Sequence, residues 1–423
     1  MSYTFHSVAS PWTVILNYLP WTLAKPQAKG DDSTDDYSAI SAKKTATEAA
    51  GSLLVFPPGV YQIGTDITFA GFVAFAPGAS LKPLSGVTVT FSSTALVFSA
   101  EDFQDTSASG VFANSGVFAN YEGGNLNLGH YDNTVSGISS LVVGGAASNL
   151  NTCAANYCLV SGSKHTITAA DHNSAIVGGA SNTINGQRDA IAGGEGNTIS
   201  DTVVNSGILA GDTNSVDNDG SACVAGELNT ASGQFTAVLA GSSNTASGGF
   251  AVTLGGVSND AQGLSCIAAG ENALAQISES FIFGAGSFSA NGDAQTGFLT
   301  AVASTTDATP TEMFNNSGER LALANHRCWA FRASIAARGD NSGTSEHAGY
   351  FLDGVIKRDG SAATTALVGT VTKTVIAEDD AAWDVAASVD TTFGALVLTV
   401  TGAASKSINW VARVEITVVG LTV

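Results

Sequence analysis

The densest acidic run in the later part of the chain is Glu378-Asp379-Asp380, which Trp383 follows closely. Two carboxyl groups held at a fixed separation can hydrolyse a glycosidic bond, one as general acid and the other as nucleophile or general base. Consecutive acidic residues before a tryptophan also suit a solvated turn, and the sequence favours this second interpretation. We therefore predict no catalytic residues and keep glycan cleavage as the alternative.

Histidine and acidic residues elsewhere lack the arrangement of a known catalytic or metal motif. His165 and His172 stand in a degenerate repeat copy, without an HExxH motif or a triad-like context. Four acidic residues at turns of the repeat could in principle bind Ca²⁺ as a ladder: Glu195, Asp212, Glu227 and Glu271. They do not recur regularly, so we predict no metal ion and no cofactor.

The five cysteines are Cys153, Cys158, Cys223, Cys266 and Cys328. Cys223 and Cys266 occupy apolar strand positions of the repeat, where a thiol acts as a small hydrophobic group. Cys153 and Cys158 lack the spacing and the histidine partners of a zinc site. We expect reduced thiols and assembly in a host cytoplasm.

A short internal repeat from about Ile138 to Ala290 must position most of these side chains. The clearest copies are Ile176-Val177-Gly178-Gly179 with Asn182, Ile191-Ala192-Gly193-Gly194 with Asn197, Ile208-Leu209-Ala210-Gly211 with Asn214, Cys223-Val224-Ala225-Gly226 with Asn229, Val238-Leu239-Ala240-Gly241 with Asn244, and Thr253-Leu254-Gly255-Gly256 with Asn259. The second glycine recurs in steps of 14 to 17 residues between Gly145 and Gly270. This period predicts a β-solenoid with two strands of about five residues and two tight turns per coil.

The repeated glycines and asparagines have a structural interpretation. Glycine suits turns that need a positive φ, and stacked asparagines can form a ladder of hydrogen bonds between coils. No lysine or helix start follows the glycines, as a phosphate-binding loop would require. We therefore expect a repetitive scaffold.

The first strand of each coil predicts self-association. Ile208 and Leu209 point to opposite faces of the strand, yet both are apolar, and the pairs Ile176-Val177 and Val238-Leu239 repeat this pattern. A two-layered coil buries only one of these faces. The other face needs a cover, and another copy of the chain can supply it. The repeat also resembles the head repeats of trimeric autotransporter adhesins, and this resemblance implies a trimeric β-roll.

An acidic turn, a helix and a strand pair precede the repeat. The turn contains Asp31, Asp32, Asp35 and Asp36, a polar helix is expected from about Asp35 to Ala50, and Leu53 to Ile63 reads as strand, turn and strand. This order resembles the module that opens the pectate-lyase-like β-helix of phage tailspikes and tail fibres. The aspartates then read as turn and cap formers. Alternating apolar residues continue the coils at Phe69, Phe72, Phe75, Leu81, Val87 and Val97.

The two ends of the chain differ from this solenoid. Between Trp12 and Trp21 the chain is short and aromatic and is interrupted by Pro20, which suits a core strand or a docking peptide. From Asn291 the strands alternate as in an antiparallel β-sandwich, at Trp329–Ile335, Tyr350–Ile356, Lys373–Ile376, Trp383–Val385, Leu396–Val400 and Ile408–Val418. This portion resembles C-terminal domains of phage tail fibres, notably around Thr374 to Trp383. It also holds nine of the sixteen basic residues.

The net charge of −20 opposes binding to nucleic acid or to anionic membranes. No secretory signal or membrane span is recognisable, which weakens a secreted adhesin as a third interpretation. We expect an all-β chain with five parts: an attachment segment (1–28), a pectate-lyase-like module (29–105), a linker (106–137), the β-roll (138–290) and a receptor-binding β-sandwich (291–423).

The sequence thus predicts a homotrimeric tail fibre or tailspike, made in the host cytoplasm and carried on the virion tail. Its N-terminus would bind a tail or baseplate protein, and its C-terminal domain a host-surface glycan or protein. The alternative function is a polysaccharide depolymerase with sites between the subunits.

Overall fold

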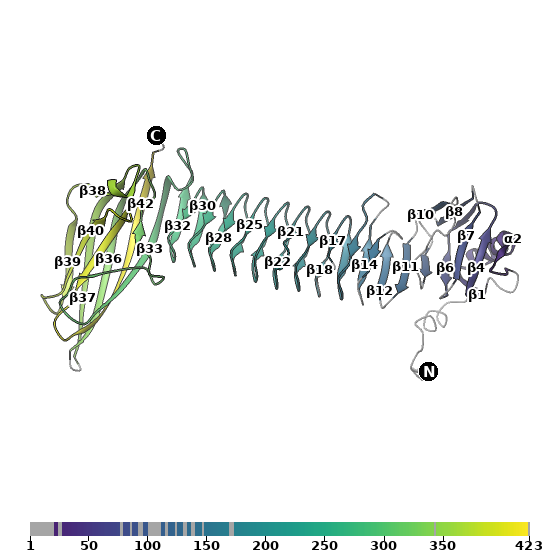
Figure 1. The fold of residues 1–423 in the computed structure, drawn as a ribbon, viewed down its shortest axis with the longest axis horizontal. Coiled ribbons are helices and arrows are strands. Elements are labelled where there is room, and N and C mark those ends of the chain that lie inside the picture. Colours follow the sequence, from purple (N-terminus) through teal and green to yellow (C-terminus); the bar gives the residue numbers. More distant parts are fainter. Residues whose placement is uncertain are drawn as a thin grey trace. The chain divides into compact units, whose positions relative to one another are not determined.

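The computed structural model describes residues 21–23, 28–76, 79–84, 87–91, 96–99, 111–114, 117–122, 125–129, 133–136, 140–145, 148–168, 173–341 and 344–421. The chain forms two compact units, Met1–Gly193 and Gly194–Val423. Strands dominate both units (Figure 1). The unit boundary falls inside the repeat and not at either of its predicted ends.

The first unit opens with the predicted helix and strand pair. Helix α2 spans Tyr37–Ala50 and ends at Gly51, whose left-handed φ of 59° suits a C-cap glycine. Strands β3 (Leu53–Phe56) and β4 (Gly59–Ile63) follow, and β4 pairs in parallel with β2 (Asp31–Asp35). Further parallel strands stack on them: β5 (Ile67–Phe69), β6 (Phe72–Phe75), β7 (Ala79–Pro83), β8 (Thr88–Phe91) and β9 (Leu96–Ser99).

Aromatic side chains form the core of this module. Phe56 stacks on Phe75 with ring centroids 4.7 Å apart, and it meets Tyr61 and Phe69 edge-on. All four side chains are fully buried. The predicted order of turn, helix and strands is therefore confirmed by a closed local core.

Strands occur where the sequence predicts a linker and an attachment segment. Within 106–137 lie β10 (Val111–Asn114), β11 (Val117–Glu122), β12 (Asn125–Gly129) and β13 (Thr134–Val135). They pair with β8, β9, β14 and β15 respectively, so this stretch continues the solenoid. Strand β1 (Trp21–Leu23) pairs with β3. Trp12 lies outside the described residues.

The repeat forms the predicted coils in both units, each with two parallel ladders of strands (Figure 1). In the first unit the strands are β14 (Leu141–Gly144), β15 (Thr152–Cys153), β16 (Leu159–Gly162), β17 (Thr166–Ile167), β18 (Ala175–Ile176), β19 (Thr183–Ile184) and β20 (Ala190–Ile191). In the second they are β21 (Thr198–Ile199), β22 (Gly207–Ile208), β23 (Ser215–Val216), β24 (Ala222–Cys223), β25 (Thr230–Ala231), β26 (Ala237–Val238), β27 (Thr245–Ala246), β28 (Val252–Val257), β29 (Asp260–Ala261), β30 (Ile267–Glu271), β31 (Leu274–Ala275) and β32 (Phe281–Ala285).

Most of these strands contain two residues, so the predicted length of about five was wrong. The remaining positions of each coil form turns, and some residues of these turns have a positive φ. Gly241, at the second glycine of its copy, has φ 97°, and a Cβ there would collide with the carbonyl of Gly256 in the next coil. Leu228, Phe235 and Phe250 also have a positive φ, which is a strained conformation for bulky side chains.

The predicted asparagine ladder is present and fully buried. Asn229 Oδ1 accepts the backbone N–H of Asn244 at 3.0 Å, and Asn244 Oδ1 accepts that of Asn259 at 3.0 Å. Each side-chain amide donates to a carbonyl of its own coil and to one of the next, as Asn244 does to Ala240 and Gly256. The ladder satisfies backbone groups that the short strands leave unpaired inside the roll.

A short ladder of hydroxyl side chains, which the sequence analysis missed, lies at the start of three successive first strands, at Ser206, Ser221 and Thr236. Ser206 Oγ accepts the N–H of Ser221, and Ser221 Oγ accepts the N–H of Thr236 at 3.0 Å. Ser221 Oγ also donates to the Gly233 carbonyl at 2.8 Å. The signal was partly available, because Ser206, Ser221 and Thr236 recur at this position in steps of fifteen residues, before Ala251 and Cys266 replace them.

After β32 the chain enters the C-terminal domain, which consists of two antiparallel sheets. One contains β33 (Ala294–Thr305), β36 (Arg327–Asn341), β37 (Thr344–Arg358), β38 (Ala366–Leu367), β39 (Thr372–Glu378) and β42 (Ser407–Gly420). The other contains β34 (Thr311–Glu312), β35 (Leu321–Ala322), β40 (Asp384–Asp390) and β41 (Ala395–Thr401). Strand β33 pairs with both β32 and β42, so the first sheet continues the sheet of the roll.

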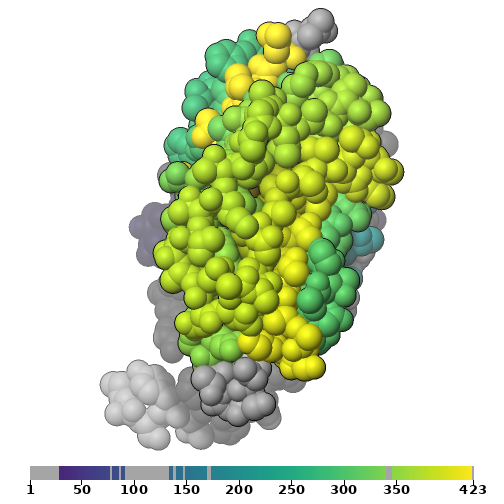
Figure 2. Space-filling model, turned by 90° about the vertical axis from the view of Figure 1, so that its left-hand side faces the viewer, coloured from purple at the N-terminus to yellow at the C-terminus, as the bar shows by residue number. Residues whose placement is uncertain are grey.

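Large side chains fill the space between these two sheets. Trp383 and Trp410 lie 5.6 Å apart, and Tyr350 stacks beside Trp410 at 6.4 Å. Trp410 Nε1 donates to Thr305 Oγ1 at 3.0 Å, which satisfies its buried indole N–H. Green and yellow residues from the end of the chain form most of the domain face in Figure 2.

Candidate functional site

The roll exposes the apolar face that its sequence pattern predicts. Ile208 is 2% exposed, whereas its neighbour Leu209 is 60% exposed. Leu239 and Leu254 occupy the equivalent position of later coils and are also exposed. Beyond them the face continues over exposed residues of β32 and β33: Phe281, Phe283 and Phe298. We call this surface the apolar roll face. It consists of Leu209, Val224, Leu239, Leu254, Phe281, Phe283 and Phe298.

Two exposed phenylalanines stand at a turn of the same roll. Phe235 and Phe250 are stacked with their ring centroids 5.4 Å apart. Both rings are more than half exposed although the backbone at both residues is strained. The same turn position also has a positive φ at Gly220, Ser265 and Glu279, so the turn sets this conformation and the two phenylalanines add to the exposed apolar surface of the roll.

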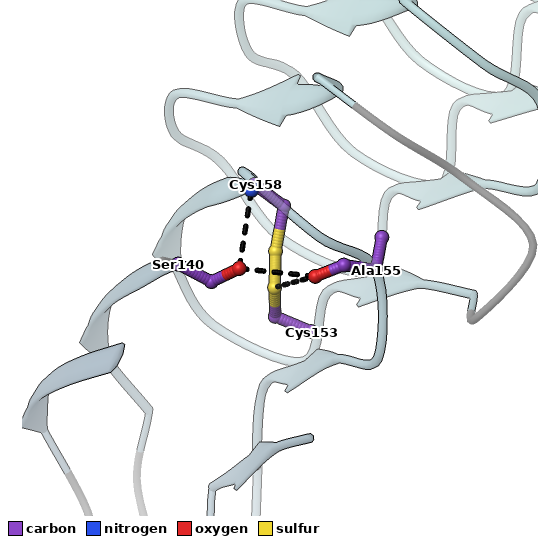
Figure 3. Close-up of a disulfide and its surroundings, with 4 residues drawn as sticks. All are labelled: Ser140, Cys153, Ala155 and Cys158. Atoms are coloured by element: carbon purple, nitrogen blue, oxygen red, sulfur yellow. Dashed lines mark hydrogen bonds between the residues drawn. A yellow bond between two sulfur atoms is a disulfide. The ribbon is translucent and has the colours of Figure 1, made fainter. Parts of the chain in front are cut away.

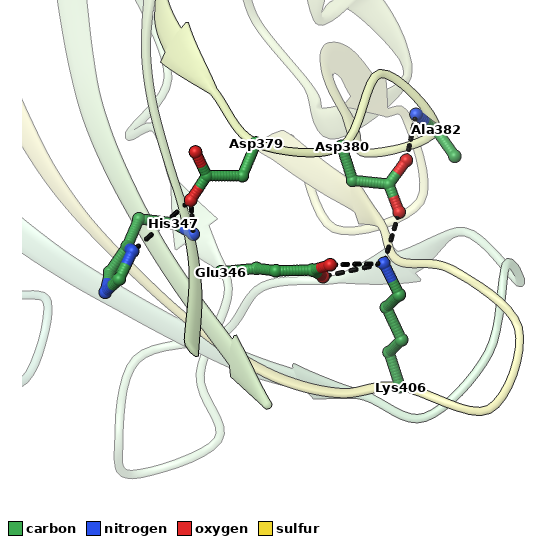
Figure 4. Close-up of polar contacts among 6 residues, drawn as sticks. All are labelled: Glu346, His347, Asp379, Asp380, Ala382 and Lys406. Atoms are coloured by element: carbon green, nitrogen blue, oxygen red, sulfur yellow. Dashed lines mark hydrogen bonds and ion pairs between the residues drawn. The ribbon is translucent and has the colours of Figure 1, made fainter. Parts of the chain in front are cut away.

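The predicted acidic turn of the C-terminal domain is a set of structural contacts (Figure 4). Glu378 accepts the hydroxyl of Tyr350 at 2.9 Å, and Asp379 accepts the backbone N–H of His347 at 2.7 Å. Asp380 pairs with Lys406 at 2.6 Å. Three adjacent carboxyl groups therefore contact three different partners.

Lys406 is the centre of this cluster because it also pairs with Glu346 at 2.6 Å. The ammonium group lowers the pKa of Asp380, and the pKa of Lys406 is raised by Asp380 first and by Glu346 second. The general acid of a glycosidase needs a raised pKa, so the lowered pKa of Asp380 does not suit that role. The cluster fastens the turn after β39 to the end of the β36–β37 hairpin.

The aspartates of the N-terminal turn act as turn formers. Asp31 accepts the N–H groups of Ser33 and Thr34, which lowers its pKa to about 2. Asp36 accepts the N–H groups of Lys29 and Gly30. Of the others, Asp35 accepts the N–H groups of Tyr37 and Gly64, and Asp32 pairs with Lys82.

The acidic column of the roll is interrupted. Glu195, Asp212 and Glu227 lie on successive coils, but Ser242 and Val257 follow at the same position before Glu271. Within the described residues, no group of three or more histidine, cysteine or acidic side chains is placed to hold a metal ion. The absence of a metal site stays a prediction.

The cysteines behave in two ways. Cys223 and Cys266 are buried free thiols, as predicted, and burial raises their pKa values to about 12 and about 11. Cys153 and Cys158, expected to be reduced, form a disulfide (Figure 3). Cys153 is the last residue of β15, and Cys158 immediately precedes β16. Both side chains are buried in the coil interior. This proximity across a turn is the physical reason for the correction.

His165 occupies an asparagine position of the ladder. Its backbone N–H donates to Asn151 Oδ1 at 3.0 Å, and its Nδ1 accepts the N–H of Asn182 at 3.1 Å. The ring is fully buried, and desolvation lowers its pKa. A neutral ring is therefore required, and His165 serves as a structural acceptor. His172 lies outside the described residues.

The basic residues gathered in the C-terminal domain are mostly paired. Arg332 contacts Asp353 at 2.6 Å, Lys357 contacts Asp359 at 3.0 Å and Lys373 contacts Asp384 at 2.5 Å. These pairs cancel most of the positive charge that the sequence predicts for a receptor site.

The chain matches no protein-family model and no curated protein sequence. Among the described residues, no helix has the length and the apolar composition that crossing a membrane requires.

Three solved structures illustrate what the chain is similar to. The tailspike protein of Acinetobacter phage vB_ApiP_P1 is 10% identical over 94% of this chain and 88% of its own, with a TM-score of 0.20. The Dettilon tailspike protein is 10% identical over 93% and 94%, with a TM-score of 0.25. A tailspike of Acinetobacter baumannii bacteriophage Fri1, described as a capsular polysaccharide depolymerase, is 9% identical over 95% and 88%, with a TM-score of 0.18. TM-scores this low carry no inference about function.

Proposed function

We propose that the chain is a tailspike or tail fibre of a phage or phage-like particle and mediates attachment to a host cell. The order of its parts supports this function: a short helix-capped solenoid module, a β-roll and an antiparallel C-terminal domain. This order is the one that the resemblance to tail fibres and tailspikes implies. The virion tail is the corresponding location, after synthesis in the host cytoplasm.

The apolar roll face is the observation that carries the proposal. A single chain leaves Leu209, Leu239 and Leu254 in contact with water, and contiguous apolar surface of this kind marks an interface. The face repeats with the coils, so an identical chain offers a matching surface. Three chains is the number that the resemblance to adhesin heads implies.

The two ends of the chain would divide the labour. The segment 1–28 would bind a tail or baseplate protein, and the C-terminal domain would bind a glycan or protein of the host surface. A trimer multiplies each weak contact by simultaneous engagement. The net charge of −20 per chain keeps nucleic acid and anionic membranes from competing.

Sedimentation and competition test this function together. Equilibrium sedimentation at micromolar concentration should give three times the chain mass of 42.5 kDa. The purified protein should also block adsorption of the particle to its host. A stable folded monomer would contradict the assembly, and normal particle adsorption at saturating protein would contradict the attachment function.

The alternative function is polysaccharide depolymerisation at sites between subunits. The acidic side chains of Glu378, Asp379 and Asp380 each contact another residue of the same chain, so this alternative places the catalytic carboxyl groups elsewhere. Incubation of the protein with host capsule or lipopolysaccharide distinguishes the depolymerase from the attachment protein. New reducing ends or unsaturated sugars would favour the enzyme, and bound but intact polysaccharide would favour the attachment protein.

A further inference from the structure

A groove of about 490 Å³ lies where the last coil of the roll meets the C-terminal domain, within the second unit. Its volume is in the usual range for small-molecule sites. Ile277, Ala322, Leu323 and Ala324 give it an apolar lining, and Gln276, Glu319, Arg320 and Phe393 add polar and aromatic groups. An apolar floor with a few polar groups is the usual composition of a ligand site.

The walls of this groove are held in place before any ligand arrives. Glu319 accepts the N–H of Ser278 at 3.1 Å, which fastens the loop before β35 to the last coil. Leu323 donates its N–H to the carbonyl of Gly394 at 2.9 Å, which joins that strand to the turn bearing Phe393. A preformed site avoids the entropic cost of ordering loops on binding.

Phe393 is fixed although it is 56% exposed. Asp390 accepts its backbone N–H at 3.1 Å and also contacts Arg320 Nε at 3.2 Å. The Arg320 guanidinium lies 4.6 Å from the centre of the Phe393 ring and 5.1 Å from that of Phe314. The structure thus presents an exposed aromatic ring in a rigid orientation.

The charge around the groove is negative. Arg320 pairs with both Glu312 and Asp390, which leaves Glu319 without a compensating cation in this cluster. An acidic ligand would meet excess carboxylate, so the groove favours an uncharged one or one bearing an amine.

We propose that this groove binds an uncharged or amino sugar residue of a host-surface glycan. The apolar C–H face of a pyranose packs against the Phe393 ring, while its hydroxyls bond to Gln276 and Glu319. This inference rests on the proposed attachment function and assigns it a place in the fold. The Arg320 cluster positions the ring and makes no contact of its own with charged sugars.

The test uses the full-length protein on an array of uncharged, amino-bearing and acidic bacterial oligosaccharides. Phe393→Ala should weaken binding to uncharged or amino-bearing glycans at least tenfold, and Phe393→Tyr should retain it because the ring remains. Phe288→Ala is the matched control, since Phe288 is 71% exposed and lies outside the groove. Melting curves of all the variants should coincide with that of the original protein.

Two results would contradict the proposal that this groove binds a sugar residue. One is equal binding of the Phe393→Ala and original proteins, and the other is binding by the original protein to acidic glycans only or to none. Competition for particle adsorption separates this failure from failure of the attachment function. If the Phe393→Ala and original proteins block adsorption equally, the attachment function is retained and the groove is excluded as its binding site. If neither blocks adsorption, the attachment function itself fails.

Discussion

The β-roll and the C-terminal domain of the second unit are stabilised in opposite ways. The roll interior contains asparagine, serine and small apolar residues, and buried ladders of hydrogen bonds connect each coil to the next. The C-terminal domain surrounds Trp383, Trp410 and Tyr350 and carries ion pairs on its surface. Each coil of the roll therefore depends on the neighbouring coils, whereas the C-terminal domain has a core of its own.

The largest expected effect comes from Ile208→Asp. An unpaired charge would be buried in the roll, which costs several kcal/mol in every chain. The unfolding midpoint should fall sharply, and limited proteolysis should cut within the roll.

Leu209→Asp is the matched control, because it places the same charge on the neighbouring exposed residue. We expect its coils to remain folded, since the charge stays in water within one chain, while the assembly dissociates. A normal mass for Leu209→Asp in sedimentation would remove the apolar roll face from the interface.

A smaller effect is expected from Asn244→Ala. The change deletes the acceptor of the Asn259 N–H and leaves that group unsatisfied inside the roll. The free energy of unfolding should fall by about 1–3 kcal/mol. Thr245→Ala alters the adjacent, partly exposed residue and should change stability little. Equal denaturation curves for both variants would show that the ladder is dispensable.

Spacing alone predicted the ladder, because each asparagine follows its glycine by three residues. The apolar character of both Ile208 and Leu209 also predicted that one apolar face of the roll is exposed, and Leu209 lies on that face. Contacts between distant parts of the chain could not be predicted. Lys406 meets Glu346 from sixty residues away, and Arg320 meets Asp390, so neither the ion-pair cluster nor the groove has a local sequence signature.

Two other features were within reach of the sequence. Cys153 and Cys158 occupy interior positions five residues apart across a coil turn, so their approach follows once the repeat is aligned. His165 stands where the neighbouring copies have asparagine. Irregular copies obscured both, because the step between second glycines there is longer than in the regular coils.

The variant His165→Asn tests whether the buried histidine makes the stability of the roll depend on pH. The pKa of His165 is lowered from its ordinary 6.5, so the unfolded chain takes up a proton more readily. The contribution of neutral His165 to the stability of the fold is fully present above pH 6.5. It is lost as the pH falls through the pKa that His165 has in the folded protein. The melting temperature should fall less between pH 7 and pH 5 in His165→Asn than in the original protein. Parallel curves would show that folding does not lower the pKa of His165.

The smallest expected effect comes from Arg332→Ala. Its partner Asp353 is partly exposed, and solvent and salt screen such a pair. The denaturation midpoint should not change measurably in 150 mM salt. A large loss of stability would mean that surface ion pairs hold the C-terminal domain together, against the contrast drawn with the roll.

The ladder has a consequence for how such a gene can change. The regular coils from Asn214 to Asn259 share the asparagine ladder, and each bonds through it to the coils on either side, so one such coil can be duplicated or lost without altering the ladder bonds of the rest. Recombination between the repeats would then lengthen or shorten the protein in steps of about 4.8 Å. The length of the roll could thus evolve separately from the C-terminal domain, and in the proposed attachment function it would set the distance between particle and cell surface.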